Sequence, residues 1–167
     1  MSAMNIRIET IADRDAVHAL LCTAFDGDGE AGLVQSLHAD GDVVLSLVAE
    51  TEGVVCGHVL FSRLHVVNGD TRFPAVALAP LAVSPTHQRQ GIAARLVEEA
   101  HRRLITTGET LSVVLGEPAY YGRFGYRHED AAKFESAYQC EALQAVRWGD
   151  DAPGTGKLVY ASAFGGL

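Results

Sequence analysis

Residues 75–105 constrain the fold of this chain more than any other stretch. Residues 75–83 are an apolar run with the composition of a strand buried on both faces. Pro80 lies inside this run, and because proline has no N–H for a sheet ladder, the strand must bulge or part from a neighbour near residues 80–82. A strongly amphipathic helix follows, and its apolar positions are Ile92, Ala93, Leu96, Val97, Ala100 and Leu104.

The junction between this strand and this helix has the features of an anion site. A tight loop at a helix start points several unpaired N–H groups at one spot, at the positive end of the helix dipole. Gly91 lets the backbone approach a ligand because it has no Cβ, and Arg89 adds a full charge. The loop therefore favours a pyrophosphate group, without the lysine of a P-loop. The residues concerned are Gln88, Arg89, Gln90, Gly91, Ile92 and Ala93.

The other elements alternate along the chain. Before residue 75 we expect a strand at 5–9, a helix with its buried face in 17–24, a loop at 25–32, a short helix at 33–37 and strands at 43–50 and 54–67, the last ending at an Asn68-Gly69 hairpin. After the long helix, which Gly108 stops, we expect a strand at 111–115, a short helix at 119–124, a strand from about Tyr126, and an antiparallel pair at 138–143 and 157–161.

This order of elements indicates one domain, residues 1–167, of the α+β or mixed α/β class. The strands at 75–83 and 111–115 flank a helix, so they are expected to be parallel neighbours joined by a right-handed crossover.

Composition excludes several classes of protein. The hydrophobic content of 48% argues against a disordered chain, and no apolar run reaches the ~20 residues that span a bilayer. The start has no signal-peptide core, and three cysteines without C-x-x-C spacing favour reduced thiols and a cytoplasmic location. The net charge of −8 argues against nucleic acid as a partner. The histidines and cysteines show no metal-ligand spacing.

The motifs resemble those of a known superfamily. Residues 88–93 resemble the Q/R-x-x-G-x-G/A signature of the GNAT superfamily of acyl-CoA-dependent N-acetyltransferases, and residues 81–83 resemble its bulged fourth strand. Residues 118–126 resemble its later Y-x-x-x-G-F element. The resemblance covers residues 75–126, and the N-terminal part fits more loosely. The detail around Pro80, Pro118 and Tyr120-Tyr121 is closest to a bacterial branch of predicted acetyltransferases whose substrates are not named.

This resemblance implies a fold and a co-substrate site. The fold would be a central mixed sheet of about six to seven strands with helices on both faces, and two parallel central strands would splay apart to admit CoA. Pro80 and Gly116 fall where residues of the splay would not pair. The co-substrate would be acetyl-CoA, with the pantetheine beside Leu81, Ala82 and Val83 and the pyrophosphate on residues 88–93.

The same resemblance implies two catalytic groups. Tyr121 aligns with the tyrosine beside the CoA sulfur and would act as the general acid that protonates the departing thiolate. The backbone N–H of Leu81 would bind the oxyanion. Tyr121 could instead be an ordinary core aromatic residue, and Tyr120 is the alternative acid.

The general base stays open in the sequence. Many members carry a glutamate on the strand that here spans residues 75–83, and this chain has no acid there. A water relay or capture of the minor neutral amine could also serve. No cysteine occupies a recognisable acyl-carrying position, and only Cys56, on a central strand, stays open for that role. The candidate replacements for the glutamate are Glu117, His87, His58 and His65.

The expected activity is acetyl transfer from acetyl-CoA to a primary amine by direct attack in a ternary complex. The acceptor would be a small molecule or a peptide, including a protein N-terminus or lysine. The alternative is a non-catalytic acyl-CoA-binding sensor. A homodimer through terminal strands would use residues 161–164 as an edge. The acidic residues Asp26, Asp28 and Glu30 form either a solvated loop or a surface that attracts an ammonium group.

Two further motif matches are rejected. Residues 27–32 match G-x-G-x-x-G, but they follow a predicted helix rather than a strand, and their acidic residues would repel a pyrophosphate. Residues 154–157 resemble the end of a P-loop but lack its first glycine and its Ser/Thr, so they are interpreted as a flexible loop.

Overall fold

The computed structural model describes residues 4–165, which form two compact units. The first contains the chain up to Phe61 together with Ala79–Arg103, and the second contains Ser62–Leu78 together with the residues from Leu104 onward. The sheet has the strand order β1-β2-β3-β4-β5-β7, with β6 and β8 attached beside it. Two long strands, β3 (Val54–Asn68) and β4 (Thr71–Val83), contribute to both units, as does helix α3 (Ile92–Thr106).

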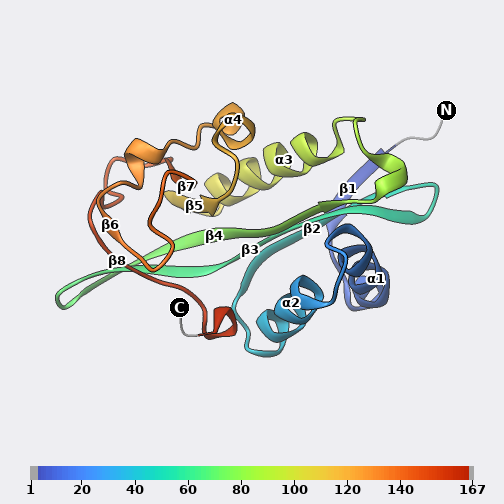
Figure 1. Cartoon of the computed structure of the whole chain (residues 1–167), viewed down its shortest axis with the longest axis horizontal. Helices are drawn as coiled ribbons and strands as arrows, with labels where there is room; N and C mark the ends of the chain where they lie inside the picture. The colour runs from blue at the N-terminus through green and yellow to red at the C-terminus, as the bar shows by residue number, and fades with distance from the viewer. Residues whose placement is uncertain (1–3, 166–167) are drawn as a thin grey trace. The chain divides into compact units, whose positions relative to one another are not determined.

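The first unit is a sheet covered by helices on both faces (Figure 1). Strand β1 (Met4–Ile8) pairs antiparallel with β2 (Val43–Thr51), and the first part of β3 and the end of β4 complete the sheet. Helices α1 (Arg14–Ala24) and α2 (Gly29–Ala39) cover one face, and α3 covers the other. A Cβ on Gly57 would lie 3.0 Å from both Ile92 and Leu96, so α3 packs directly on the β3 backbone.

The second unit extends the same strands with a different set of partners. Strand β5 (Leu111–Leu115) runs parallel to β4, with Val76 opposite Ser112 and Leu78 opposite Val114. Strand β7 (Leu143–Arg147) pairs antiparallel with β5, while β8 (Gly156–Val159) pairs antiparallel with β3 and parallel with the short β6 (Phe134–Glu135). Helix α4 (Pro118–Tyr121) follows β5. The buried core of this unit includes Leu64, Val66, Leu111, Leu143 and Leu158.

Most of the predicted architecture is confirmed. The chain is mixed α/β. Strands β4 and β5, which precede and follow α3 along the chain, are parallel neighbours in the sheet. Five of the six predicted apolar positions of α3 are buried, and Ala93 is half-buried. The helix ends at Thr106, and Gly108 adopts a φ of +97° just beyond it. The sheet contains eight strands, slightly more than predicted.

The predicted elements that differ from the structure lie mainly in the C-terminal third of the chain. Residues 138–142 form no strand, and β7 begins only at Leu143 and pairs with β5 rather than with β8. The strand predicted from Tyr126 is reduced to a single bridge between Arg127 and Ala145. Residues 29–32 belong to α2 rather than to a loop. The strand segments among these are short, and their partners are distant in sequence, so local alternation could not identify the pairing.

In the part of the chain that the structure describes, no helix is both long and apolar enough to cross a membrane.

Candidate active site

The loop between β4 and α3 exposes backbone N–H groups at a helix N-terminus. A 3-10 turn, Pro85–His87, follows β4, and residues 88–91 are all exposed. Arg95 N donates to Gly91 O at 3.1 Å, which closes the first turn of the helix. The amides that precede Arg95 in this turn therefore have no helical acceptor, and they lie at the positive end of the dipole. The loop thus has the features that an anionic group requires, as predicted.

The backbone of this loop turns through two left-handed residues. Arg89 has a φ of +65° and Gly91 has a φ of +76°. No atom lies within 4 Å of the position that a Cβ on Gly91 would take. The backbone angle, rather than crowding inside the protein, is therefore what favours glycine here.

The end of β4 follows a break in its pairing. The parallel ladder with β5 covers Val76–Leu78 and ends shortly before Pro80, which is buried and follows a cis peptide bond. This agrees with the interruption that the proline predicts. Leu81 is half-buried and Ala82 is buried. Beyond them, Ser84 N donates to Cys56 O on β3 at 2.8 Å.

Tyr121 lies in the second unit, at the end of the short helix α4. The helix is capped by Glu117, whose side chain accepts from Ala119 N. The Tyr121 ring is half-buried and meets Tyr120 and Tyr126 edge-on, with ring centroids 5.1 and 5.9 Å away. Burial raises the pKa of Tyr121 to about 12, so the phenol stays protonated near neutral pH.

Gly116 provides the space that the Tyr121 ring occupies. Its N–H donates to Ala142 O, and its carbonyl accepts from Gln144 Nε2. The ladder between β4 and β5 ends at Val114, before Gly116, in agreement with the expected lack of pairing across the splay, while the segment leading into β7 takes up both backbone groups of Gly116 on its other side. A Cβ on Gly116 would overlap the Tyr121 ring.

Replacing Gly116 by alanine should displace Tyr121 and lower the free energy of unfolding by about 1–3 kcal/mol, as for other overpacked sites. Urea denaturation would measure the loss. Gly122→Ala is the matched control, since Gly122 has a helical φ of −56° and nothing within 4 Å of its Cβ position. Equal stability of the two variants would contradict the close packing at Gly116.

The four candidate bases lie in different surroundings. Glu117 is exposed at its helix cap, and His65 contacts Arg72, both in the second unit. His87 is half-buried in the first unit and contacts the Thr86 hydroxyl at 3.0 Å. His58 on β3 is fully buried and belongs to a polar network.

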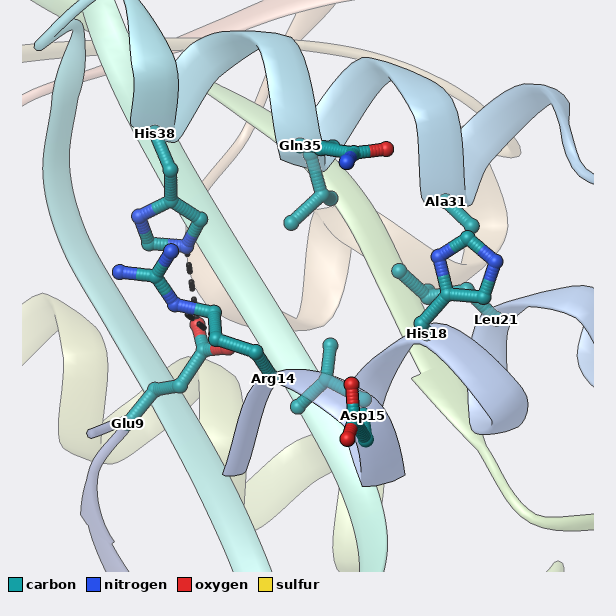
Figure 2. A pocket seen from close by; sticks show the side chains of 10 residues that line it. Glu9, Arg14, Asp15, His18, Leu21, Ala31, Gln35 and His38 are labelled. Atoms are coloured by element: carbon teal, nitrogen blue, oxygen red, sulfur yellow. Dashed lines mark hydrogen bonds and ion pairs between the residues drawn. The ribbon is translucent and has the colours of Figure 1, made fainter. Parts of the chain in front are cut away.

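That network joins strands β2 and β3 of the first unit to Glu9, which directly follows β1. Ser46 Oγ on β2 lies 2.5 Å from Glu9 Oε1 and 2.9 Å from His58 Nε2. His38 Nε2 on α2 lies 3.1 Å from the same carboxylate, and Arg14 Nε on α1 lies 3.7 Å from its other oxygen. Figure 2 shows His38 and Arg14 reaching Glu9 from the two helices.

A pocket of about 180 Å³ between α1 and α2 opens beside this carboxylate. Burial alone would raise the pKa of Glu9, but the nearby His58 ring, the hydrogen bond from Ser46 and the contact with His38 outweigh it and lower the pKa to about 2. Glu9 therefore remains a buried anion at neutral pH. The pocket is lined by Glu9, Arg14, Asp15, Val17, His18, Leu21, Ala31, Val34, Gln35 and His38.

Sequence reasoning named His58 but missed Glu9 and Ser46. The available signal was weak: Ser46 is a polar residue inside the apolar strand β2, and Glu9 directly follows β1. Serine and glutamate at such positions are usually solvated, so only the folded structure shows that they meet.

The structure also places the two rejected motif matches and the predicted dimer edge. The G-x-G-x-x-G match follows helix α1 and so lacks the strand that a dinucleotide site needs, as expected. Residues 154–157 run into a strand rather than a helix, so they are not a P-loop, and the loop expected there ends at residue 155 because Gly156 and Lys157 belong to β8. The predicted edge at residues 161–164 is wrong, since Ser162–Phe164 forms a 3-10 turn. Within residues 4–165, no group of three or more His, Cys, Asp or Glu side chains could hold a metal ion.

The acidic loop is only partly a loop. Asp26 has a left-handed φ of +51°, and Asp28 lies just before α2. Glu30 is in the first turn of α2, where a carboxylate interacts favourably with the helix dipole. This position gives Glu30 a structural role that needs no ligand.

Comparison with known proteins gives consistent matches. A family model described as an acetyltransferase (GNAT) domain matches residues 5–128. The N-acetyltransferase YhbS of Escherichia coli K12 is 39% identical over 96% of this chain and 98% of its own length. The crystal structure of E. coli YhbS in complex with CoA superposes with a TM-score of 0.89 at 36% identity, covering 98% of this chain and 93% of that chain. A GNAT family acetyltransferase from Brucella melitensis, solved with acetyl-CoA, gives a TM-score of 0.82 at 32% identity, covering 97% and 98%.

Proposed function

Because this chain belongs to the GNAT family of acyl-CoA-dependent N-acetyltransferases, we propose that it transfers an acetyl group from acetyl-CoA to a primary amine by direct attack within a ternary complex. The observation that carries this proposal is the exposed loop at residues 88–91, which presents free amides at the start of α3. The CoA and acetyl-CoA complexes of the two similar proteins support it.

The co-substrate contacts follow from this loop and from β4. We assign the pyrophosphate to Gln88, Arg89, Gln90, Gly91, Ile92 and Ala93, and the pantetheine to Leu81, Ala82 and Val83. Strand residues near Pro80 are suited to the second role because their β5 ladder has already ended at Leu78. Free strand amides and carbonyls can then pair with the amides of a linear ligand.

The chemistry needs an oxyanion donor and an acid. The amine lone pair attacks the thioester carbon, a tetrahedral oxyanion forms, and a thiolate leaves. In the proposal the Leu81 N–H donates to the oxyanion, and the Tyr121 hydroxyl protonates the thiolate. Burial, which raises the pKa of Tyr121 to about 12, keeps the phenol protonated at neutral pH but also makes it a weaker acid, so the transfer requires the sulfur to be held close to the hydroxyl.

The proposal extends to the organisation of the protein. We treat residues 1–167 as one catalytic domain, because the matching family model spans parts of both compact units. The free thiols of Cys22, Cys56 and Cys140 favour a cytoplasmic location. The acceptor would be a small molecule or a peptide, and a homodimer would use an edge other than residues 161–164.

Replacing Gly91 by alanine should weaken acetyl-CoA binding about tenfold, because a Cβ at its φ of +76° costs about 1–2 kcal/mol and turns the loop amides. Isothermal titration would measure this. Gly69→Ala is the control: Gly69 has a φ of +57° and open space around its Cβ position, but it lies in the β3–β4 turn. Equal losses of affinity in both variants would contradict the assignment of the loop.

The test of the activity combines binding with turnover. Acetyl-CoA, CoA and NADH would be titrated into the purified protein, and thiol release would be followed with 1,3-diaminopropane, 1,5-diaminopentane and a glycine-terminated tripeptide. We expect binding of the two CoA species and amine-dependent thiol release. Binding without release would favour the acyl-CoA sensor, and absence of CoA binding would overturn the proposal.

A further inference from the structure

The network around Glu9 determines which nitrogen of His58 carries a proton. An ionised carboxylate can only accept, so Ser46 Oγ donates its single proton to Glu9 Oε1 at 2.5 Å. Ser46 Oγ must then accept at its other contact, and His58 Nε2 donates to it at 2.9 Å. In the neutral imidazole the lone pair therefore lies on Nδ1.

This Nδ1 is a basic atom without a protein partner. The His58 side chain is fully buried, and its Nδ1 has no hydrogen-bond partner among the described residues. Buried polar atoms are nearly always hydrogen-bonded, and exceptions often mark functional positions. The arrangement of a carboxylate, a linking hydroxyl and an imidazole with one free nitrogen is that of an oriented base.

His58 also lies beside the segment of β4 assigned to the pantetheine and the oxyanion. The bond from Ser84 N to Cys56 O sets an antiparallel register in which Ala82 is opposite His58. The register can also be counted from the hairpin that joins β3 to β4. A two-residue turn there pairs Asn68 with Thr71, and this register would place Leu81 opposite His58. Both counts bring His58 to the level of Leu81 and Ala82, within the first unit.

The structure also shows to which face of the sheet the His58 side chain points. Gly57 faces α3, because a Cβ there would contact Ile92 and Leu96. Successive strand residues point to opposite faces, so His58 points to the face covered by α1 and α2. This is the face on which Glu9 lines the pocket between those helices.

We propose that His58 is the proton acceptor of the acetyl transfer, and that Ser46 and Glu9 are its positioning residues; this rests on the proposed function. The amine lone pair forms the N–C bond, and the C–S pair leaves on sulfur. His58 Nδ1 first takes one proton from the ammonium, directly or through one water, which frees this lone pair, and the second proton leaves the nitrogen to solvent after the attack. Tyr121 protonates the sulfur, and solvent returns the proton from the imidazolium to the phenolate.

The charged groups around the imidazole suit the state that forms. Glu9 Oε1 lies 3.6 Å from His58 Nε2, so an anion faces the imidazolium and stabilises it. Arg14 on α1 and His38 on α2 contact Glu9 rather than His58, and the other titratable groups that line the pocket beside Glu9 are Asp15 and His18 on α1. The electrostatic effect of the network on His58 is therefore dominated by the carboxylate.

His58→Gln tests the base directly, since glutamine can still donate to Ser46 but has no basic nitrogen. With the most rapidly acetylated amine of the panel, we expect kcat at pH 7 to fall at least about tenfold. The loss should shrink as pH rises, because more of the amine is already neutral. Turnover equal to wild type, or a loss that does not change with pH, would overturn the proposal.

Variants of the two positioning residues supply a second readout, the pH profile of kcat/KM, which would not shift if Glu9 and Ser46 had only a structural role. Removing the carboxylate in Glu9→Gln destabilises the imidazolium, so the acidic limb of the kcat/KM profile should shift to lower pH. Ser46→Ala should disturb the same limb, and Ser46→Thr, which keeps the hydroxyl, should restore it. A uniform fall in rate without a shift of this limb in either variant would contradict the positioning roles.

A matched control and a baseline keep the outcomes distinct. His101→Gln also removes a buried imidazole, one that meets Phe61 edge-on from α3, and it should leave the shape of the pH profile unchanged. Acetyl-CoA titration of every variant checks that the fold is retained. If the wild-type protein shows no amine-dependent thiol release, the proposed function fails; if only the His58→Gln effect is missing, the proton acceptor alone is wrong.

Discussion

Replacing Tyr121 by phenylalanine is expected to lower kcat about 100-fold or more, with little change in acetyl-CoA affinity. The hydroxyl is the only group that this change removes, and the edge-on contacts of the ring with Tyr120 and Tyr126 remain. Burial raises the pKa of Tyr121 to about 12, above the thiol value of about 8.5, so the thiolate takes up this proton only from a hydroxyl held beside it, and loss of the donor should affect the departure of the thiolate. Steady-state thiol release and isothermal titration would separate the two effects.

Tyr120→Phe is the control for this prediction. Tyr120 is the neighbouring phenol, and Arg123 lies over its ring at 5.1 Å. We expect near wild-type turnover from this variant. If Tyr120→Phe lost activity and Tyr121→Phe did not, the acid would be Tyr120. If neither variant changed kcat, protonation of the thiolate by this helix would be excluded.

Replacing Glu9 by glutamine should remove about 3 kcal/mol of acid-sensitive stability. The pKa of Glu9 is about 2 in the folded protein against an ordinary value of 4.5, and each pKa unit is worth about 1.4 kcal/mol. A lowered folded-state pKa means that the unfolded chain binds the proton first as pH falls. This stability is therefore fully present above about pH 4.5 and is lost between about pH 4.5 and 2.

Urea denaturation at several pH values would measure this contribution. Between neutral pH and about pH 2.5, the free energy of unfolding should fall less steeply for Glu9→Gln than for the wild-type protein. Glu52→Gln, at the exposed turn after β2, is a matched control that should keep the wild-type pH dependence. Parallel curves for wild type and Glu9→Gln would show that Glu9 is not held as a buried anion.

The two largest effects test different parts of the molecule. Tyr121 belongs to the second unit, and its role was inferred from a motif resemblance. Glu9 belongs to the first unit, and no motif marks it. The first residue could be selected before the structure was known, and the second could not.

Local patterns were sufficient for the central part of the chain. The apolar run ending at Val83, the loop at residues 88–91 and the amphipathic face of α3 each depend on residues close together in sequence, so periodicity and turn chemistry predicted them. Pro80 likewise predicted the end of the β5 ladder, because a missing N–H is a property of the residue itself.

The pairing of the strands is the part of the fold that could least be predicted from the sequence. The short strands β7 and β8 find their partners on β5 and β3, which are distant in the chain. The same limit applies to Gly116, whose backbone groups are taken up by Ala142 and Gln144. Pairing depends on register between remote segments, and short strands carry little local information about it.

By itself, the sequence determined the strand–loop–helix segment at residues 75–105, the mixed α/β class and the family to which the chain belongs. Only the tertiary structure decided that Glu9, Ser46 and His58 meet, and therefore which nitrogen of His58 is free. The physical reason is that periodicity and motifs are properties of neighbouring residues, whereas a hydrogen-bonded network between β2, β3 and the residue that follows β1 exists only once β1, β2 and β3 are in register.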